Sequence, residues 1–223
     1  MKNYCVIDTH YLVRMNSVIL GMPGETLANI VNTDIYLIDQ IIKGRYKSGG
    51  RLLDAGCGGG RNISWFVTQP GFEIYATDIS QPAIDHLSQL YPGIKREHAI
   101  CAPIQSLPFD NSFFDHVICS AVLHFAGSAQ DFLQMFSELC RVLKTGGSLF
   151  IRMASDIGIE NNIVDIGDGR FALPDGTDRF LLTRALIEQL LANFPVVLVE
   201  PVKTTNVQDI RCMTTLMIRK STS

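Results

Sequence analysis

The sequence has few charged residues and no excess of basic ones. Only 18% of its 223 residues are charged, and 19 lysines and arginines against 22 aspartates and glutamates leave a net charge of −3. Proteins that bind nucleic acid usually carry clustered positive charge, so this composition argues against a nucleic-acid partner. The six cysteines are scattered, with no pair at the short spacing of a structural zinc site or a redox dithiol. We therefore expect reduced thiols and a cytoplasmic protein.

Long apolar runs are also lacking. No uninterrupted apolar segment approaches the roughly 18 residues of a membrane span, and the first residues show no basic stretch followed by an apolar run and a cleavage site. We expect neither export nor a membrane partner. A length of 223 residues fits one α/β domain with a sizeable core.

The chain does contain apolar segments of strand length that alternate with segments of helical pattern. Strands are predicted at residues 51–54, 72–77, 97–101, 114–120 and 148–153. Helices are predicted at 25–43, after Gly60, after the cap formed by Ser80 with Pro82, and at 129–143. Alternation of this kind predicts an α/β fold, with a doubly wound and mostly parallel sheet.

Two later segments depart from the alternation. Glycines and a proline interrupt residues 155–180, which predicts a long excursion that could cover a site as a lid. Residues 196–202 and 210–219 predict two final strands around a loop at 204–209, which brings the sheet to seven strands with an antiparallel C-terminal edge hairpin. We therefore expect an N-terminal helical cap (1–48), a core (51–153), a lid insertion (155–180) and a C-terminal helix with strands (181–223), all in one domain.

A glycine-rich turn follows the first predicted strand directly. Asp54 is followed by Gly56, Gly58 and Gly60, and glycines at such a turn let a ligand approach the main chain closely. Asp78 ends the second strand, where its carboxylate can accept hydrogen bonds from both hydroxyls of a ribose. A nicotinamide-dinucleotide loop would have a third glycine at the position of Arg61. The turn therefore indicates a nucleoside cofactor of another class.

Four ordered motifs make the resemblance specific. They are Asp54-Ala55-Gly56-Cys57-Gly58-Gly59-Gly60, Asp78-Ile79-Ser80, Leu107-Pro108-Phe109 leading into Phe114-Asp115-His116-Val117, and Arg141-Val142-Leu143-Lys144-Thr145-Gly146-Gly147. Together they resemble the class I S-adenosylmethionine-dependent methyltransferase family, in its small-molecule branch (types 11 and 25). The resemblance covers about residues 51–152 and resumes in the last strands. It implies a Rossmann-like methyltransferase fold, S-adenosyl-L-methionine as cofactor and S-adenosyl-L-homocysteine as product.

The resemblance also implies roles for individual residues. Gly56 and Gly58 would pass against the methionine part of the cofactor, and Asp54 would orient the loop and the cofactor's amino group. Asp78 would bind the ribose, and Ile79 would pack on the adenine face. The implied cofactor-binding residues are Asp54, Gly56, Cys57, Gly58, Asp78, Ile79, Pro103, Ile104 and Ser120.

The adenine edge departs from the family's pattern. The family usually has an acidic residue followed by a small one before the Leu-Pro-Phe element, and Pro103 and Ile104 occupy those positions. Pro103 offers no side-chain acceptor for the adenine amino group, although the Ile104 N–H could still donate to the ring. Either adenine recognition is looser here or another group supplies it.

Catalysis of methyl transfer needs orientation more than acid–base chemistry, because a sulfonium is already electrophilic. If the acceptor must lose a proton, His124 is the candidate base; otherwise it is a capping or packing histidine. An acidic acceptor could be clamped by basic and phenolic side chains, or those groups could be ordinary surface residues: Tyr11, Arg14, Arg152, Arg170 and Arg179. We predict no metal, because Asp165, Asp168, Asp175 and Asp178 lack the calcium-loop spacing.

The sequence predicts a methyltransferase that transfers a methyl group by in-line displacement to a small-molecule acceptor, as a monomer or homodimer. Two alternatives stay open. One is a protein that binds S-adenosylmethionine or S-adenosylhomocysteine without catalysis, and the other is an NAD-dependent oxidoreductase.

Overall fold

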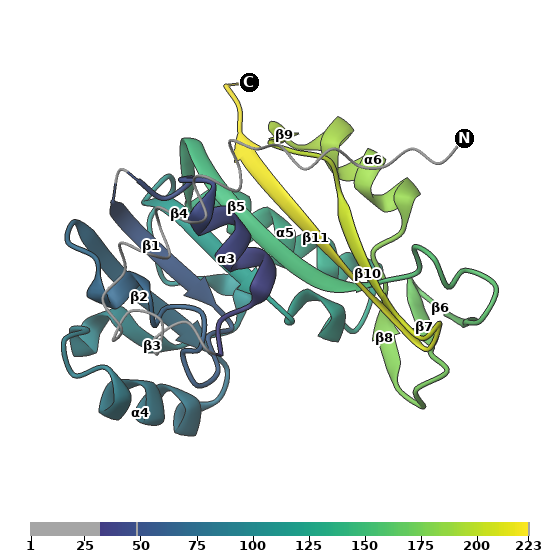
Figure 1. Ribbon diagram of the computed structural model, residues 1–223, viewed down its shortest axis with the longest axis horizontal. Coiled ribbons are helices and arrows are strands. Elements are labelled where there is room, and N and C mark those ends of the chain that lie inside the picture. Colours follow the sequence, from purple (N-terminus) through teal and green to yellow (C-terminus); the bar gives the residue numbers. More distant parts are fainter. Residues whose placement is uncertain (1–31, 48, 223) are drawn as a thin grey trace.

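A computed structural model describes residues 32–47 and 49–222 (Figure 1). Its centre is a sheet in the order β10-β11-β5-β4-β1-β2-β3, and β9 pairs with β11 in addition. The strands are β1 (Gly50–Ala55), β2 (Phe72–Asp78), β3 (Ala99–Cys101), β4 (Phe114–Ser120), β5 (Leu143–Ser155), β9 (Val196–Leu198), β10 (Lys203–Val207) and β11 (Arg211–Lys220). β1 to β5 are parallel, whereas β11 runs antiparallel to β5, β9 and β10. The predicted doubly wound, mostly parallel sheet with an antiparallel C-terminal hairpin is confirmed.

Both faces of this sheet are covered, which explains why its central strands are apolar throughout. Successive residues of a strand point to opposite faces, and Leu52 packs in one core cluster while Leu53 packs in the other. The first cluster includes residues of α3 (Ile35–Ile42) and α4 (Gln81–Leu90). The second includes residues of α5 (Ala129–Val142) and α6 (Arg184–Asn193). The domain is therefore a three-layer α/β structure.

The segment predicted as a lid insertion contains a small sheet of its own. β6 (Val164–Gly167), β7 (Arg170–Ala172) and β8 (Asp178–Phe180) form a three-stranded antiparallel sheet. Figure 1 shows it at the end of the molecule opposite α4, beside the turn that joins β10 to β11. Phe180 anchors it, because its ring stacks on Phe132 of α5 with the ring centroids 4.7 Å apart. The excursion between β5 and α6 is thus built on a packed sheet rather than on irregular chain.

Two predicted helices were wrong, one in its bounds and the other in its existence. Within the described residues the first helix begins only at Ile35, because the Asp34 side chain accepts the Tyr36 N–H at 3.0 Å and caps it; residues 25–31 lie outside the described part. No α-helix follows the glycine turn at all. Turns lead to a short 3-10 helix at Phe66–Thr68, and Pro70 and Gly71 then end the segment.

The predicted C-terminal strands were also displaced. Residues 204–209 were expected to form a loop, but β10 occupies most of that range and pairs with β11. The turn between them is tighter than expected, because Gln208 and Asp209 both take positive φ (52° and 57°) and reverse the chain in few residues. The third strand is shorter than predicted as well, since 96–98 form a 3-10 turn.

Across residues 32–47 and 49–222, none of the helices combines the length and the apolar character that crossing a membrane requires.

Candidate functional site

The order of strands in the sheet reverses between β1 and β4. β1 pairs with β2 on one side and with β4 on the other, and ligands of open α/β sheets bind beyond the carboxyl ends of the strands at such a switch point. The glycine turn leaves β1 at Gly56, and Ala121 directly follows β4. Ala121 takes a φ of 63°, which is uncommon for a residue with a side chain.

Asp78 fixes the shape of the glycine turn. Its Oδ2 accepts the Gly58 N–H at 2.8 Å, and its Oδ1 accepts the Ser80 N–H at 2.9 Å. A carboxylate has about four acceptor positions, so Asp78 keeps capacity to accept two further hydroxyl donors. Gly58 takes a φ of 50°, and a Cβ built on it would meet no atom of the described residues within 4 Å. The turn therefore presents bare main chain to an open space.

A cavity of about 410 Å³ lies beside Asp78. Its lining is mostly apolar, with a polar contribution from Asp78 and Gln105: Gly56, Gly58, Asp78, Ile79, Ala102, Ile104, Gln105, Ala121, Val122, Phe125 and Met135. Ile79 is 77% exposed, although it is a large apolar residue. An apolar slot with a carboxylate at its wall has the chemistry needed to hold a nucleoside.

Gln105 lines this cavity, and a hydrogen bond fixes the orientation of its side-chain amide. Its Nε2 donates to Asp131 Oδ1 at 2.6 Å, and an ionised carboxylate can only accept hydrogen bonds. The amide nitrogen must therefore face Asp131, which leaves the amide oxygen to point elsewhere. Pro103 does not line the cavity, whereas its neighbours Ala102 and Ile104 do.

A second cavity of about 520 Å³ lies on the other side of the glycine turn and shares Gly56, Gly58 and Ala121 with the first. Cys57, Asn62 and Ser120 also line it. Burial raises the pKa of the Cys57 thiol well above its usual range, and the nearby Asp54 and Asp78 raise it further, so Cys57 is no nucleophile.

Ser120 belongs to a buried polar cluster that ties α3 to the sheet. Its hydroxyl donates to Asp34 Oδ2 at 3.1 Å, and Arg152 of β5 reaches the same oxygen at 3.3 Å. The Asp34 side chain is fully buried. The Arg152 guanidinium also lies over the ring of Tyr36, 5.2 Å from its centroid. These contacts hold Arg152 in place at the carboxyl end of β5.

Asp54 lies beneath the glycine turn and does not line either cavity. The residue is 1% exposed, and neither carboxylate oxygen has a hydrogen-bond partner among the residues that the structure describes. Burial raises its pKa to about 7, although Arg61 lowers the pKa and Asp78 raises it. A buried unpaired carboxylate costs free energy, and a cationic ligand held by the turn would favour the ionised form. The buried carboxyl thus fits a positively charged cofactor.

A third cavity of about 440 Å³ extends from the same point toward the small sheet. Basic and apolar side chains line it: Arg61, Ala121, His124, Phe125, Arg152, Ala154, Asp175, Thr177, Arg179, Val207, Arg211 and Met213. Ala121 lines all three cavities, and Phe125 lines both the first and the third. The three spaces therefore meet at the end of β4.

His124 is buried at the wall of the third cavity. Its Nδ1 accepts the Ala154 N–H at 3.3 Å, so in the neutral ring the proton is on Nε2. Burial lowers the pKa of His124 to about 4, and Arg179 and Arg211 lower it further. At neutral pH the ring is therefore an uncharged hydrogen-bond donor rather than a group ready to accept a proton.

Residues 53–151 match a family model described as a methyltransferase domain. This match identifies the segment as a methyltransferase domain. The matched segment runs from β1 into β5 and includes the glycine turn, Asp78 and Ala121.

Relatives and solved structures agree with this domain. The chain is 35% identical over 101 residues to the biotin biosynthesis bifunctional protein BioHC of Cellvibrio japonicus, covering 45% of this chain and 19% of that protein. It is 35% identical over 96 residues to malonyl-[acyl-carrier protein] O-methyltransferase of Salmonella typhimurium, covering 43% and 36%. The chain thus spans well under half the length of these curated relatives.

A crystal structure of the Burkholderia thailandensis 1,6-didemethyltoxoflavin-N1-methyltransferase, with 1,6-didemethyltoxoflavin and S-adenosylhomocysteine bound, superposes with a TM-score of 0.62. The identity is 15%, over 100% of this chain and 94% of that one. At this level of identity, the similarity is evidence for a shared fold alone.

The methyltransferase domain brings together most of the residues predicted for the site. Among the substrate candidates, Arg152 and Arg179 line the third cavity, whereas Arg170 does not. Tyr11 and Arg14 lie outside the described residues. Sequence reasoning missed several lining residues, among them Arg61, Asn62, Gln105 and Arg211. Only Gln105 carried a signal, since it follows the two positions where the adenine edge was expected.

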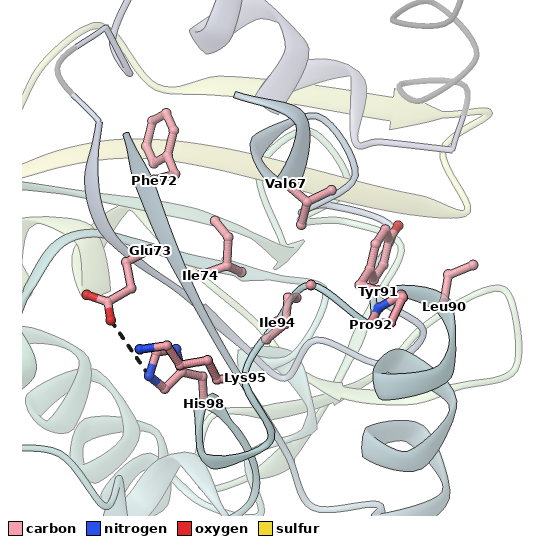
Figure 2. Close-up of a pocket in the computed structure, with 11 residues that line it drawn as sticks. Val67, Phe72, Glu73, Ile74, Leu90, Tyr91, Pro92, Ile94, Lys95 and His98 are labelled. Carbon is pink, nitrogen blue, oxygen red and sulfur yellow. Dashed lines mark ion pairs between the residues drawn. The ribbon is translucent and has the colours of Figure 1, made fainter. Parts of the chain in front are cut away.

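A further cavity, of about 480 Å³, lies at the opposite end of the sheet from the methyltransferase site (Figure 2). Phe72 and Ile74 at the beginning of β2 line it, together with the chain that follows α4. Figure 2 shows Glu73 and His98 facing each other there, with 3.7 Å between Oε1 and Nε2. Asp78 lies at the other end of the same strand, so this cavity has no part in the site at the glycine turn.

Proposed function

We propose that this chain is an S-adenosylmethionine-dependent methyltransferase that acts on a small molecule. The observation that carries the proposal is the meeting of three cavities at Ala121: one beside Asp78, one along the glycine turn, and one that opens to a different set of side chains. When bound, S-adenosylmethionine supplies an electrophilic methyl group on a sulfonium. An acceptor in the third cavity would reach that group at the junction, in line with the bond that breaks.

Particular residues hold the two ends of the cofactor. Each oxygen of Asp78 already accepts one main-chain N–H, from Gly58 or Ser80. The remaining acceptor positions of the carboxylate accept hydrogen bonds from the ribose hydroxyls. Ile79 covers one face of the adenine, and the Gln105 amide oxygen accepts from the adenine amino group in place of the family's acid. The main chain of the glycine turn, with Ser120, lines the space for the methionine part. Asp54 acts through its charge from beneath the turn.

The chain's contribution to the chemical step is orientation and exclusion of water, which can lower a barrier by roughly 7 kcal/mol or more. S-adenosylmethionine held by these residues would supply its methyl carbon to a lone pair of the acceptor, and the electron pair of the carbon–sulfur bond would stay on the departing S-adenosylhomocysteine. His124 positions the acceptor by donating from Nε2, because Nδ1 is engaged by Ala154. A proton released by a neutral acceptor would pass to water.

The volume of the third cavity, about 440 Å³, supports a small-molecule acceptor rather than a nucleic acid. We further propose that the protein works in the cytoplasm as a monomer or homodimer.

Turnover separates this proposal from a protein that only binds the cofactor. The full chain is incubated with methyl-labelled S-adenosylmethionine and panels of small carboxylic acids, phenols, amines and thiols, and S-adenosylhomocysteine formation is measured. Acceptor-dependent formation that Asp78→Ala reduces and Asp85→Ala does not is the expected result; Asp85 is an exposed acid on α4. Tight binding without turnover on any panel would contradict the proposal and favour a non-catalytic binder.

A further inference from the structure

The third cavity, which the proposed function assigns to the methyl acceptor, is lined by arginines from four separate segments. Arg61 follows the glycine turn, Arg152 lies on β5, Arg179 on β8 and Arg211 at the beginning of β11. These positions are up to 150 residues apart in sequence. A concave surface that gathers several arginines has a positive potential, which favours the binding of an anion.

The carboxylates near this cavity offset its positive charge only in part. Arg152 is paired with Asp34, but among the described residues no carboxylate lies within ion-pair distance of Arg61, Arg179 or Arg211. Asp175 is the one acid among the described residues of the lining. Its Oδ1 accepts the Thr177 N–H at 3.0 Å and the Thr177 hydroxyl at 2.6 Å. These hydrogen bonds lower the pKa of Asp175, and the charges of Arg211 and Arg179 lower it further, so a single lining carboxylate faces four arginines.

Apolar side chains make up another part of the lining. Phe125 is 63% exposed, and the Arg179 guanidinium lies over its ring at 5.0 Å from the centroid. Val207 and Met213 approach from the terminal hairpin. Side chains of this kind pack against an apolar or aromatic body, whereas the arginines recognise a planar or tetrahedral oxyanion. Phe125 also lines the nucleoside cavity, so such a body would lie next to the cofactor.

We propose that the acceptor is a small organic anion, with an ionised carboxylate or phosphate held by Arg179 and Arg211 and an apolar body packed against Phe125. This inference rests on the proposed function, since it assigns the substrate class of the same site. The charge selects the acceptor, and the position of Phe125 directs its nucleophilic atom toward the junction at Ala121.

The test uses calorimetry on the full chain saturated with S-adenosylhomocysteine. The probes are benzoate, phenyl phosphate and benzamide, which share a phenyl ring and differ in the head group. We expect one or both anions to bind, with affinity that falls as ionic strength rises, and benzamide to bind at least tenfold more weakly. The tighter of the two anions identifies the head group.

Matched variants place the anion. Arg179→Gln and Arg211→Gln should each weaken anion binding at least tenfold. Arg219→Gln, an exposed arginine on the same strand as Arg211 but outside the cavity lining, should change it less than twofold. Equal binding of benzamide, absence of anion binding to the saturated protein, or equal effects of the three variants would overturn the inference. Failure of S-adenosylhomocysteine itself to bind would instead contradict the proposed function.

Discussion

Replacing Gly58 with alanine tests whether the main chain of the glycine turn contacts the cofactor. Gly58 has a φ of 50°, and a Cβ there would meet no atom of the described residues within 4 Å. The Cβ would instead project into the space where two cavities share Gly58 as a lining residue. Gly146 is an exposed glycine with a φ of 81° and equally free space around its Cβ, but it lines neither cavity. Gly146→Ala is therefore a matched control for backbone strain.

The two substitutions should have similar effects on folding. An alanine in the left-handed region costs about 1 kcal/mol, so both variants should lower the free energy of unfolding by about that amount in urea titrations. Their effects on binding should differ. A methyl group forced into a close contact costs about 1–3 kcal/mol, which corresponds to a loss of S-adenosylhomocysteine affinity of roughly 5- to 150-fold for Gly58→Ala. Gly146→Ala should bind like the wild type.

Calorimetric titration of each folded variant measures this difference. Unchanged affinity in Gly58→Ala, together with the expected loss of stability, would refute the reasoning that the cofactor packs against this turn. An equal loss of affinity in both variants would show that strain, rather than contact, lowers binding.

Three further substitutions test other parts of the site. Asp54 has a folded-state pKa of about 7, above its usual 3.8, so its contribution to stability is greatest at low pH and is lost as pH rises toward 7. Between pH 4.5 and 8 the wild type should lose about 3 kcal/mol relative to Asp54→Asn in chemical unfolding, and parallel pH profiles would exclude a raised pKa. Asp34→Ala removes the buried partner of Arg152 and should lower the free energy of unfolding by about 3–5 kcal/mol, against under about 0.5 for the exposed Asp85→Ala. His124→Asn should lower kcat less than tenfold. The dependence of kcat on pH between pH 6 and 7 should be the same in the variant and the wild type, because His124 is already neutral there. A loss of kcat of a hundredfold or more would indicate that His124 acts as a base.

The elements that local signals specify were predicted well. β4 was placed at 114–120 because its continuous apolar run needs burial on both faces, and the structure gives the same limits. The helix after Ser80 was predicted from a capping hydroxyl and an early proline, and the Ser80 side chain does accept the Ala83 N–H. The residues that we propose hold the cofactor were predicted from the glycine turn and Asp78, which are close in sequence to the strands that position them.

Features that depend on tertiary contacts were not predictable in this way. Arg211 enters the third cavity only because β10 and β11 form a hairpin with a tight turn, and the polar residues of β10 resemble a loop in sequence. Gln105 gains its orientation from Asp131 of α5, which lies 26 residues away. His124 could be predicted at the site, but its protonation depends on the Ala154 N–H of a different strand.

Binding of S-adenosylhomocysteine to the full chain, measured by calorimetry in wild type, Asp78→Ala and Asp85→Ala, tests the central claim most directly. We expect saturable one-to-one binding to the wild type and to Asp85→Ala. Loss of two hydroxyl hydrogen bonds to a carboxylate, each contributing about 1.5 kcal/mol, should weaken binding to Asp78→Ala about a hundredfold. No saturable binding to the wild type, or equal affinities in all three proteins, would contradict the assignment of this site.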